Sequence, residues 1–144
     1  MKTILFHRED TAFVLRQKNL CRQWLENVVK EEKGRISNLN YIFCSDEYLL
    51  EINRQHLEHD YLTDVITFPY SEHPEPIESD IFISIDRCRD NAKEFGAKVN
   101  DEIHRVMVHG LLHLLGYDDK TEDEQNEMTL KEDYYLSLRP GKLK

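Results

Sequence analysis

Two histidines and an aspartate that follows them form the arrangement in this sequence that is best suited to chemistry. They lie within VMVHGLLHLLGYDD, residues 106–119, where His109 and His113 are four residues apart. Side chains at that spacing lie on one face of an α-helix, one turn from each other. Gly116 can turn the chain sharply, and Asp119, six residues after His113, then returns toward the imidazoles. Three protein ligands with one open position are the arrangement of a catalytic zinc site.

The surroundings of the two histidines favour metal ligands over ordinary core side chains. Apart from Gly110, the other residues of positions 106–115 are all apolar, which predicts a buried helix. The alternative is that each imidazole is a core side chain bonded to a carbonyl or a carboxylate, because burial without a partner is costly. The glycine turn and the aspartate favour the metal site. Asp119 is the predicted third ligand, with Asp118, or an Asp119 that acts through a water, as the alternatives.

The spacing H-x-x-x-H-x-x-G-x-x-D is the register of the metzincin zinc site, whose last position is normally histidine. In H-E-x-x-H proteases the residue after the first histidine is the glutamate general base, and here it is Gly110. A peptidase that works through that glutamate is therefore not expected. In a hydrolase of another kind, another residue must act as the general base, or the metal-bound hydroxide must attack the substrate without one.

Two smaller polar clusters stand beside the best strand candidates. Thr63 and Asp64 directly precede the apolar run VITFPY, and Ser79 and Asp80 introduce the alternating run DIFISID. Active-site groups are often placed in loops and at strand ends. Aspartate, serine and threonine also close turns for purely local reasons, and the sequence favours that local explanation at both clusters.

The elements that must position these residues follow from hydrophobic periodicity and from capping residues. Asn100 is the predicted N-cap of the histidine helix, and Gly34 and Gly96 are predicted to end two earlier helices. Strands gathered in the first two thirds and helices elsewhere indicate an α+β fold, with about four strands in a small mixed sheet packed against several helices. We predict strands over 2–7, 38–44, 65–70 and 80–86, and helices over 11–33, 46–57, 87–95, 101–115 and 121–138.

The composition bounds the class of protein. A chain of 144 residues with 40% hydrophobic residues is expected to form one domain, residues 1–144, with one core. It has no apolar run of membrane-spanning length, so no membrane partner is expected. The three cysteines, Cys21, Cys44 and Cys88, form neither a disulfide framework nor a paired metal motif, which indicates a reducing, cytoplasmic location.

The net charge of −9 argues at first against a nucleic-acid-binding protein. The charge is unevenly distributed, however. Residues 118–133 carry eight acids against two lysines, a balance of −6, whereas residues 87–98 carry a balance of +2. The acidity therefore does not exclude RNA. It predicts weak, salt-sensitive binding that needs a partner to supply affinity.

The stretch HGLLHLLGYDD resembles the motif H-G-x-L-H-L-x-G-Y-D-H of the YbeY family. TDVITFP at 63–69 is similar to the family's T-D/N-V-L-S-F-P, and SDIFISID at 79–86 is similar to G-D-I-x-I-S. EIN at 51–53 corresponds to the family's E-L-N, so the motifs run in the family's order from residue 51 to 119. The first 45 residues match the family only in pattern.

The chain departs from the family pattern at two positions. Asp119 stands where the third zinc ligand is normally histidine, and a carboxylate is a harder and negatively charged ligand. We therefore expect one zinc ion per chain, with iron, manganese or nickel as alternatives. The family's arginine after E-L-N aligns with Leu57, and Arg54, one helical turn earlier, is the candidate replacement. His59 and Asp60 stand where the family often has lysine and aspartate.

The resemblance implies a cytoplasmic, metal-dependent endoribonuclease that acts in small-subunit rRNA maturation and ribosome quality control. His109, His113 and Asp119 would hold the ion that activates water, and Arg54 is a candidate catalytic residue. The expected partners are ribosomal RNA and the ribosome or its proteins, with no nucleotide cofactor. Arg87 and Arg105 are further candidate cations for the phosphate, although an ion pair is the alternative for Arg105.

Two other functions stay open at the level of the sequence. In the first, the metal is structural and the protein is a ribosome-associated assembly factor without strong nuclease activity. A fourth ligand would then come from another segment, such as His56, His59 or Cys88. In the second, the protein is a metal-dependent amide or peptide hydrolase, which Gly110 disfavours.

Overall fold

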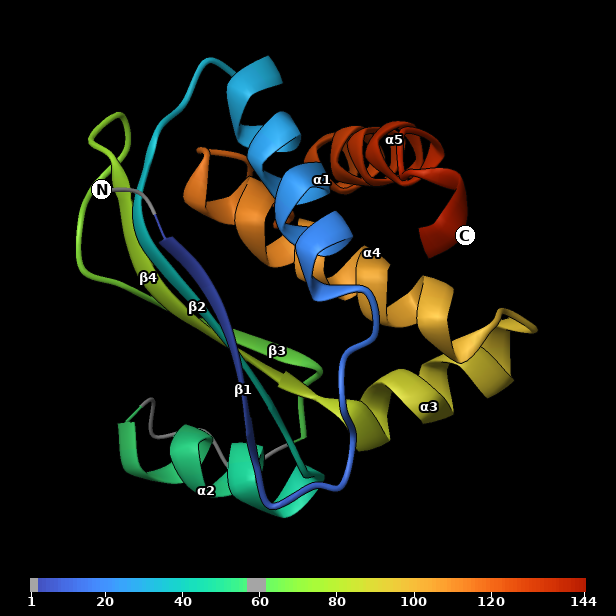
Figure 1. Cartoon of the computed structure of the whole chain (residues 1–144). Helices are drawn as coiled ribbons and strands as arrows, with labels where there is room; N and C mark the ends of the chain where they lie inside the picture. Colours follow the sequence, from blue (N-terminus) through green and yellow to red (C-terminus); the bar gives the residue numbers. More distant parts are fainter. Residues whose placement is uncertain (1–2, 57–61) are drawn as a thin grey trace.

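A four-stranded mixed sheet with helices on both faces forms the frame of the protein (Figure 1). The computed structural model describes residues 3–56 and 62–144. The strands are β1 (Thr3–Glu9), β2 (Ile36–Cys44), β3 (Val65–Pro69) and β4 (Ile77–Ser84). The helices are α1 (Lys18–Glu31), α2 (Asp46–His56), α3 (Ile85–Phe95), α4 (Val99–Leu114), α5 (Glu122–Ser137) and the short 3-10 helix η1 (Gly141–Leu143).

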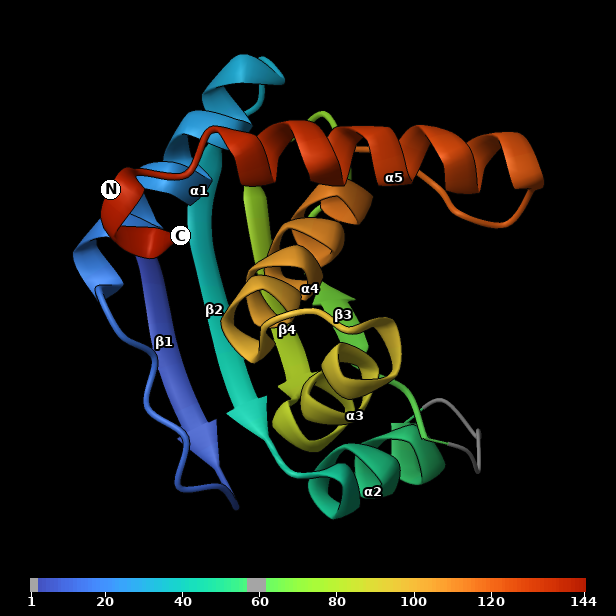
Figure 2. The ribbon, with the colours of Figure 1, turned by 90° about the vertical axis from the view of Figure 1, so that its right-hand side faces the viewer.

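The sheet has the order β1-β2-β4-β3, so that the short strand β3 lies at one edge. The β1–β2 and β2–β4 pairs are parallel, and β3 runs antiparallel to β4 with Val65 opposite Ile83. Helices α1, α3, α4 and α5 lie on one side of the sheet, and α2 covers part of the other (Figures 1 and 2). These findings confirm the α+β fold predicted from the sequence. None of the helices in the described part of the chain combines the length and the hydropathy that crossing a membrane requires.

Alternation along β4 divides the apolar side chains between two clusters. Ile81 and Ile83 point into the main core, whereas Phe82 joins a smaller cluster beneath α2. The predicted strand 80–86 is wrong at both ends, because pairing with β2 begins at Ile77 and the strand stops at Ser84. The Ser84 hydroxyl accepts a hydrogen bond from the Arg87 backbone N–H, and this cap starts α3.

The predicted helix 11–33 is too long. Helix α1 begins only at Lys18, after Gln17 in the left-handed conformation with a φ of 55°. Upstream of it, the apolar side chains pack without helical structure, with the Phe13 ring 5.1 Å from that of Phe43. The left-handed residue after the helix is Lys33, not Gly34 as predicted. Loop residues that pack on a sheet can thus produce the same apolar spacing as a helix.

Helix α4 carries the candidate site and begins earlier than predicted. Lys98 is its N-cap, and the predicted cap Asn100 lies inside the helix. The Asn100 side-chain amide donates instead to the Leu143 carbonyl oxygen, at 3.1 Å, and so ties the C-terminal segment to α4. The other helix boundaries fall close to the predictions, and Thr121 forms a capping box with Glu124 at the start of α5.

Candidate metal centre

Gly110 explains how α4 approaches the sheet closely enough to build the site. A Cβ atom at this position would lie 3.1 Å from Ile81 Cγ2 and 3.5 Å from Val65 Cγ2. The position that holds glutamate in H-E-x-x-H proteases therefore faces β4 and β3 here, where a side chain would be in tight contact with Ile81. The two histidines on either side of this contact are only partly covered, with 22% of the His109 side chain and 27% of the His113 side chain exposed.

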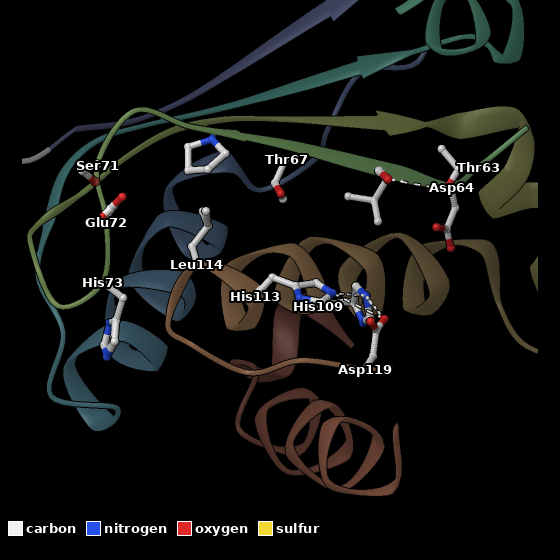
Figure 3. Close-up of a pocket in the computed structure, with 12 residues that line it drawn as sticks. Thr63, Asp64, Thr67, Ser71, Glu72, His73, His109, His113, Leu114 and Asp119 are labelled. Atoms are coloured by element: carbon white, nitrogen blue, oxygen red, sulfur yellow. Dashed lines mark hydrogen bonds and ion pairs between the residues drawn. The ribbon is translucent and has the colours of Figure 1, made fainter. Parts of the chain in front are cut away.

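Three ligand atoms converge at the C-terminal half of α4 (Figure 3). The Nε2 atoms of His109 and His113 are 3.2 Å apart, and Asp119 Oδ2 lies 3.3 Å and 3.4 Å from them. Ligand atoms bound tetrahedrally to zinc at about 2.0–2.1 Å are separated by about 3.3 Å. The donor set therefore fits a divalent transition metal, and these three residues could hold one ion.

The turn after α4 brings Asp119 to the histidines, as the sequence predicts. Gly116 adopts a φ of +105°, which side-chain-bearing residues rarely adopt, and the Tyr117 backbone N–H donates to the Leu112 carbonyl oxygen at 3.1 Å. The Tyr117 hydroxyl donates at 2.7 Å to Oε1 of Glu32, the residue that follows α1, and anchors the turn. Asp118 is exposed and does not join the ligand group, so the structure favours Asp119 over this alternative.

Negative charge surrounds the first histidine. His109 Nδ1 lies 2.6 Å from Glu132 Oε2 in α5. Burial alone would lower the pKa of His109, but the hydrogen bond and charge of Glu132 outweigh it, with Asp119 and Asp64 adding to the rise. The same charges favour a bound cation at this position.

A cavity of about 570 Å³ opens beside the three ligands. Thr63 and Asp64 enter it from the start of β3, and burial is the main reason that the pKa of Asp64 is raised. Ser79 and Asp80 do not line the cavity; the Asp80 carboxylate accepts from the hydroxyl of Tyr70 at 2.9 Å instead. The cavity is lined by Thr63, Asp64, Val65, Thr67, Pro69, Ser71, Glu72, His73, His109, His113, Leu114 and Asp119.

Sequence reasoning did not find two side chains of this region. His73 lines the far end of the cavity and packs against Gly116, at 3.4 Å from the position of a Cβ there (Figure 3). Glu132 was counted only among the acids of 118–133, although it bonds to His109. Its signal is the pattern Met128, Glu132, Tyr135, which places an acid on the buried face of α5.

The three arginines predicted to contact the phosphate form ion pairs with acidic side chains outside the cavity lining. Arg105 forms ion pairs with Glu132 at 2.9 Å and with Asp133 at 2.5 Å, which agrees with the ion-pair alternative. Arg87 Nε lies 3.1 Å from Asp46 Oδ1, and Arg54 Nη1 lies 3.9 Å from Glu51 Oε2 on α2. Among the residues that the structure describes, no lysine or arginine lines the cavity.

The residues suggested as a fourth ligand do not lie at the site, where the structure describes them. The His56 ring packs edge-on against Phe68, with ring centroids 5.9 Å apart. Cys88 is buried, and burial raises the pKa of its thiol. Neither joins the ligand group, and Leu57, His59 and Asp60 lie outside the described residues. Within residues 3–56 and 62–144, the group consists of three ligands.

The fold and the site define a class of protein: a small α+β domain with three convergent side chains that could hold a metal ion, beside an open cavity. Comparison with known proteins narrows this class. A model of the family described as "Endoribonuclease YbeY" matches residues 4–138. The chain belongs to the endoribonuclease YbeY family, which confirms the resemblance seen in the sequence motifs.

Individual relatives cover nearly the whole chain. Endoribonuclease YbeY of Cytophaga hutchinsonii is 58% identical over 138 residues, which cover 96% of each protein. Endoribonuclease YbeY of Amoebophilus asiaticus is 46% identical, and the match covers 92% of this chain and 90% of that protein. A solution structure of a protein from Thermotoga maritima is similar with a TM-score of 0.67 and 30% identity, covering 94% of this chain and 87% of that one.

Proposed function

We propose that this protein is a metal-dependent endoribonuclease with one ion held by His109, His113 and Asp119. The observation that carries the proposal is the convergence of three ligand atoms within 3.4 Å of one another beside an open cavity. The name of the relatives, which span almost the same length, supports the reaction class. When bound, the ion would lower the pKa of a coordinated water and polarise a phosphoryl oxygen of the RNA.

The protein residues then bind and orient the reacting groups. The two imidazoles point their Nε2 atoms at one position, and the partly exposed Asp119 closes the third side of it. Thr63 and Thr67 bring hydroxyl groups to the cavity, where they are suited to hydrogen bonds with ribose and phosphate oxygens. The Ser71 hydroxyl already donates to the Pro76 carbonyl oxygen at 2.8 Å. Asp64 brings a partly buried carboxylate to the same space and is a candidate proton acceptor in the absence of a glutamate at Gly110.

We propose zinc as the ion, with iron, manganese or nickel as alternatives because one ligand is a carboxylate. Compared with three histidines, this ligand set carries one more negative charge. It should make a bound water less acidic and the site less tolerant of an approaching phosphate. The Arg54 side chain does not line the cavity. A catalytic contribution of this residue therefore stays a prediction from the sequence.

We further propose that the substrate is ribosomal RNA of the small subunit and that the protein acts with the ribosome in the cytoplasm. The support for RNA is the name of the relatives, and ribosomal RNA and the ribosome are what the resemblance of the motifs implies. The net charge of −9 and a cavity whose described lining contains no lysine or arginine act against tight binding of RNA. Such a surface predicts weak intrinsic affinity for RNA, because phosphate contacts dominate RNA binding. A ribosome or ribosomal protein would then supply the missing affinity.

Cleavage of a structured ribosomal RNA fragment by the metal-loaded protein tests this function. We expect cleavage that a chelator stops and added zinc restores. Asp119→Ala should lower the cleavage rate about 100-fold or more, because the ion loses a ligand. Asp118→Ala is the matched control and should cleave normally, since Asp118 lies outside the ligand group. Metal-loaded wild-type protein that leaves the RNA intact would favour the assembly-factor alternative.

A further inference from the structure

We propose that Glu132 is a positioning residue that orients His109 and determines which nitrogen of its ring faces the metal. The proposal rests on the metal-dependent function above and concerns α5, which lies outside the sequence motifs of the site. His109 Nδ1 and Glu132 Oε2 are 2.6 Å apart, the distance of a strong charge-assisted hydrogen bond. The Glu132 side chain is only 9% exposed, so water does not compete freely for this contact.

The chemistry of the two groups fixes the direction of the bond. An ionised carboxylate can only accept, so the proton must reside on His109 Nδ1. In a neutral imidazole the lone pair is then on Nε2, which is the atom that lies 3.2 Å from His113 Nε2 and 3.3 Å from Asp119 Oδ2. A ring with the opposite tautomer would present an N–H to the ion. The contact with Glu132 therefore prepares His109 for metal binding.

Arg105 holds the second oxygen of the same carboxylate. Its Nη1 donates to Glu132 Oε1 at 2.9 Å, while its Nη2 donates to Asp133 Oδ1 at 2.5 Å. Arg105 precedes His109 by one turn of α4. The guanidinium and the imidazole therefore contact the two carboxylate oxygens of Glu132 from neighbouring positions on one helix. The pairing restricts the rotation of the Glu132 carboxylate.

A purely structural role is the alternative explanation, because a buried glutamate needs a partner and Arg105 would satisfy it alone. The two explanations differ in what they predict for Oε2. A structural ion pair needs only the Arg105 contact at Oε1, whereas a positioning role needs the contact of Oε2 with His109. The decisive measurements are therefore metal affinity and the tautomer of His109, not stability.

The first test measures zinc affinity by competition with a chromophoric chelator at neutral pH. We expect Glu132→Ala to weaken zinc binding about 10–100-fold, the usual effect of removing a partner of a ligating histidine. Glu132→Gln should lie between this variant and wild type, since its single carbonyl oxygen can serve either His109 or Arg105. Asp133→Asn is the matched control: it also contacts Arg105 but not His109, and should retain wild-type affinity.

The second test uses the wild-type protein, so it does not depend on whether a variant folds. Nitrogen-15 NMR of the histidine rings, on metal-free wild-type protein well above the pKa of His109, should show a proton on Nδ1 and none on Nε2. A proton on Nε2 of His109, or wild-type zinc affinity in a folded Glu132→Ala protein, would overturn the positioning role. Failure of the proposed function looks different, because wild-type protein would then itself bind no zinc or cleave no RNA.

Discussion

Asp119 Oδ2 lies 3.3 Å from His109 Nε2, although the two residues stand on either side of a helix end and a glycine turn. This contact joins a carboxylate to the imidazole pair and adds to the negative charge that Glu132 and Asp64 bring to the centre. Asp119 is also the most exposed of the three residues: 40% of its side chain is exposed, against 22% for His109 and 27% for His113.

Loss of a histidine ligand should remove the metal and leave the fold largely intact. We expect His113→Ala to retain little zinc by elemental analysis while its far-UV circular dichroism stays native, since the side chain is partly exposed at the cavity. His109→Ala should also lose metal and be less stable, because it leaves the Glu132 carboxylate without one partner. His73→Ala changes a cavity histidine outside the ligand group and should keep its metal. Metal retained in both ligand variants would refute the site.

Replacing Asp119 with histidine should tighten zinc binding. Imidazole nitrogen is a softer ligand than a carboxylate oxygen and suits zinc better than manganese or iron. We expect Asp119→His to bind zinc more tightly in a chelator competition and to discriminate more strongly against manganese. Asp118→His, at the exposed neighbouring position, should change neither quantity. Unchanged or weaker zinc binding in Asp119→His would count against Asp119 as a direct ligand.

The close contact of α4 with the sheet should make a side chain at Gly110 destabilising. Gly110→Ala places a Cβ atom 3.1 Å from Ile81 Cγ2, tighter than an ordinary contact. We expect overpacking, which costs about 1–3 kcal/mol, to outweigh the gain of about 1 kcal/mol that alanine brings to a helix interior, so that the free energy of unfolding falls. Urea denaturation measures this loss. Gly141→Ala is the control, since a Cβ there meets no atom within 4 Å and should cost little. Equal stability of the two variants would contradict the packing explanation.

Buried His104 should make stability depend on pH. Burial, together with the charge of Arg139, lowers the pKa of His104 to about 4. Its Nδ1 accepts from Arg139 Nη1 at 2.8 Å, so the folded protein holds the ring neutral. The unfolded chain has the ordinary histidine pKa of about 6.5 and binds a proton first as pH falls. Stability contributed by His104 is therefore complete above about pH 6.5 and is lost toward pH 4, by about 3 kcal/mol.

Urea denaturation of the metal-free protein at several pH values between these limits checks the dependence. His104→Gln can still accept from Arg139 but does not titrate in this range. We expect the variant to lose less unfolding free energy than wild type between pH 6.5 and 4. Parallel pH profiles of the two proteins would show that other groups cause the acid sensitivity.

Short-range features of the fold could be predicted from the sequence because they depend on neighbours in the chain. The spacing of His109 and His113 on one helix, the glycine turn and the start of α5 at Thr121 all follow from local geometry. The prediction failed at residues 11–17, where Phe13 finds its apolar partner Phe43 in a distant strand. Local spacing cannot distinguish a helix face from a loop that packs on a sheet.

His109, His113 and Asp119 could be predicted as candidate ligands from the sequence, because they lie in one continuous motif whose register is set by the helical repeat. The family followed from this motif together with those between residues 51 and 86. The surroundings of the three side chains depend on the tertiary structure. It brought Asp64 and His73 into the cavity, paired Arg105 with α5 and placed Glu132 against His109. These contacts join segments far apart in the chain, and they depend on how helices and sheet pack, which no local pattern specifies.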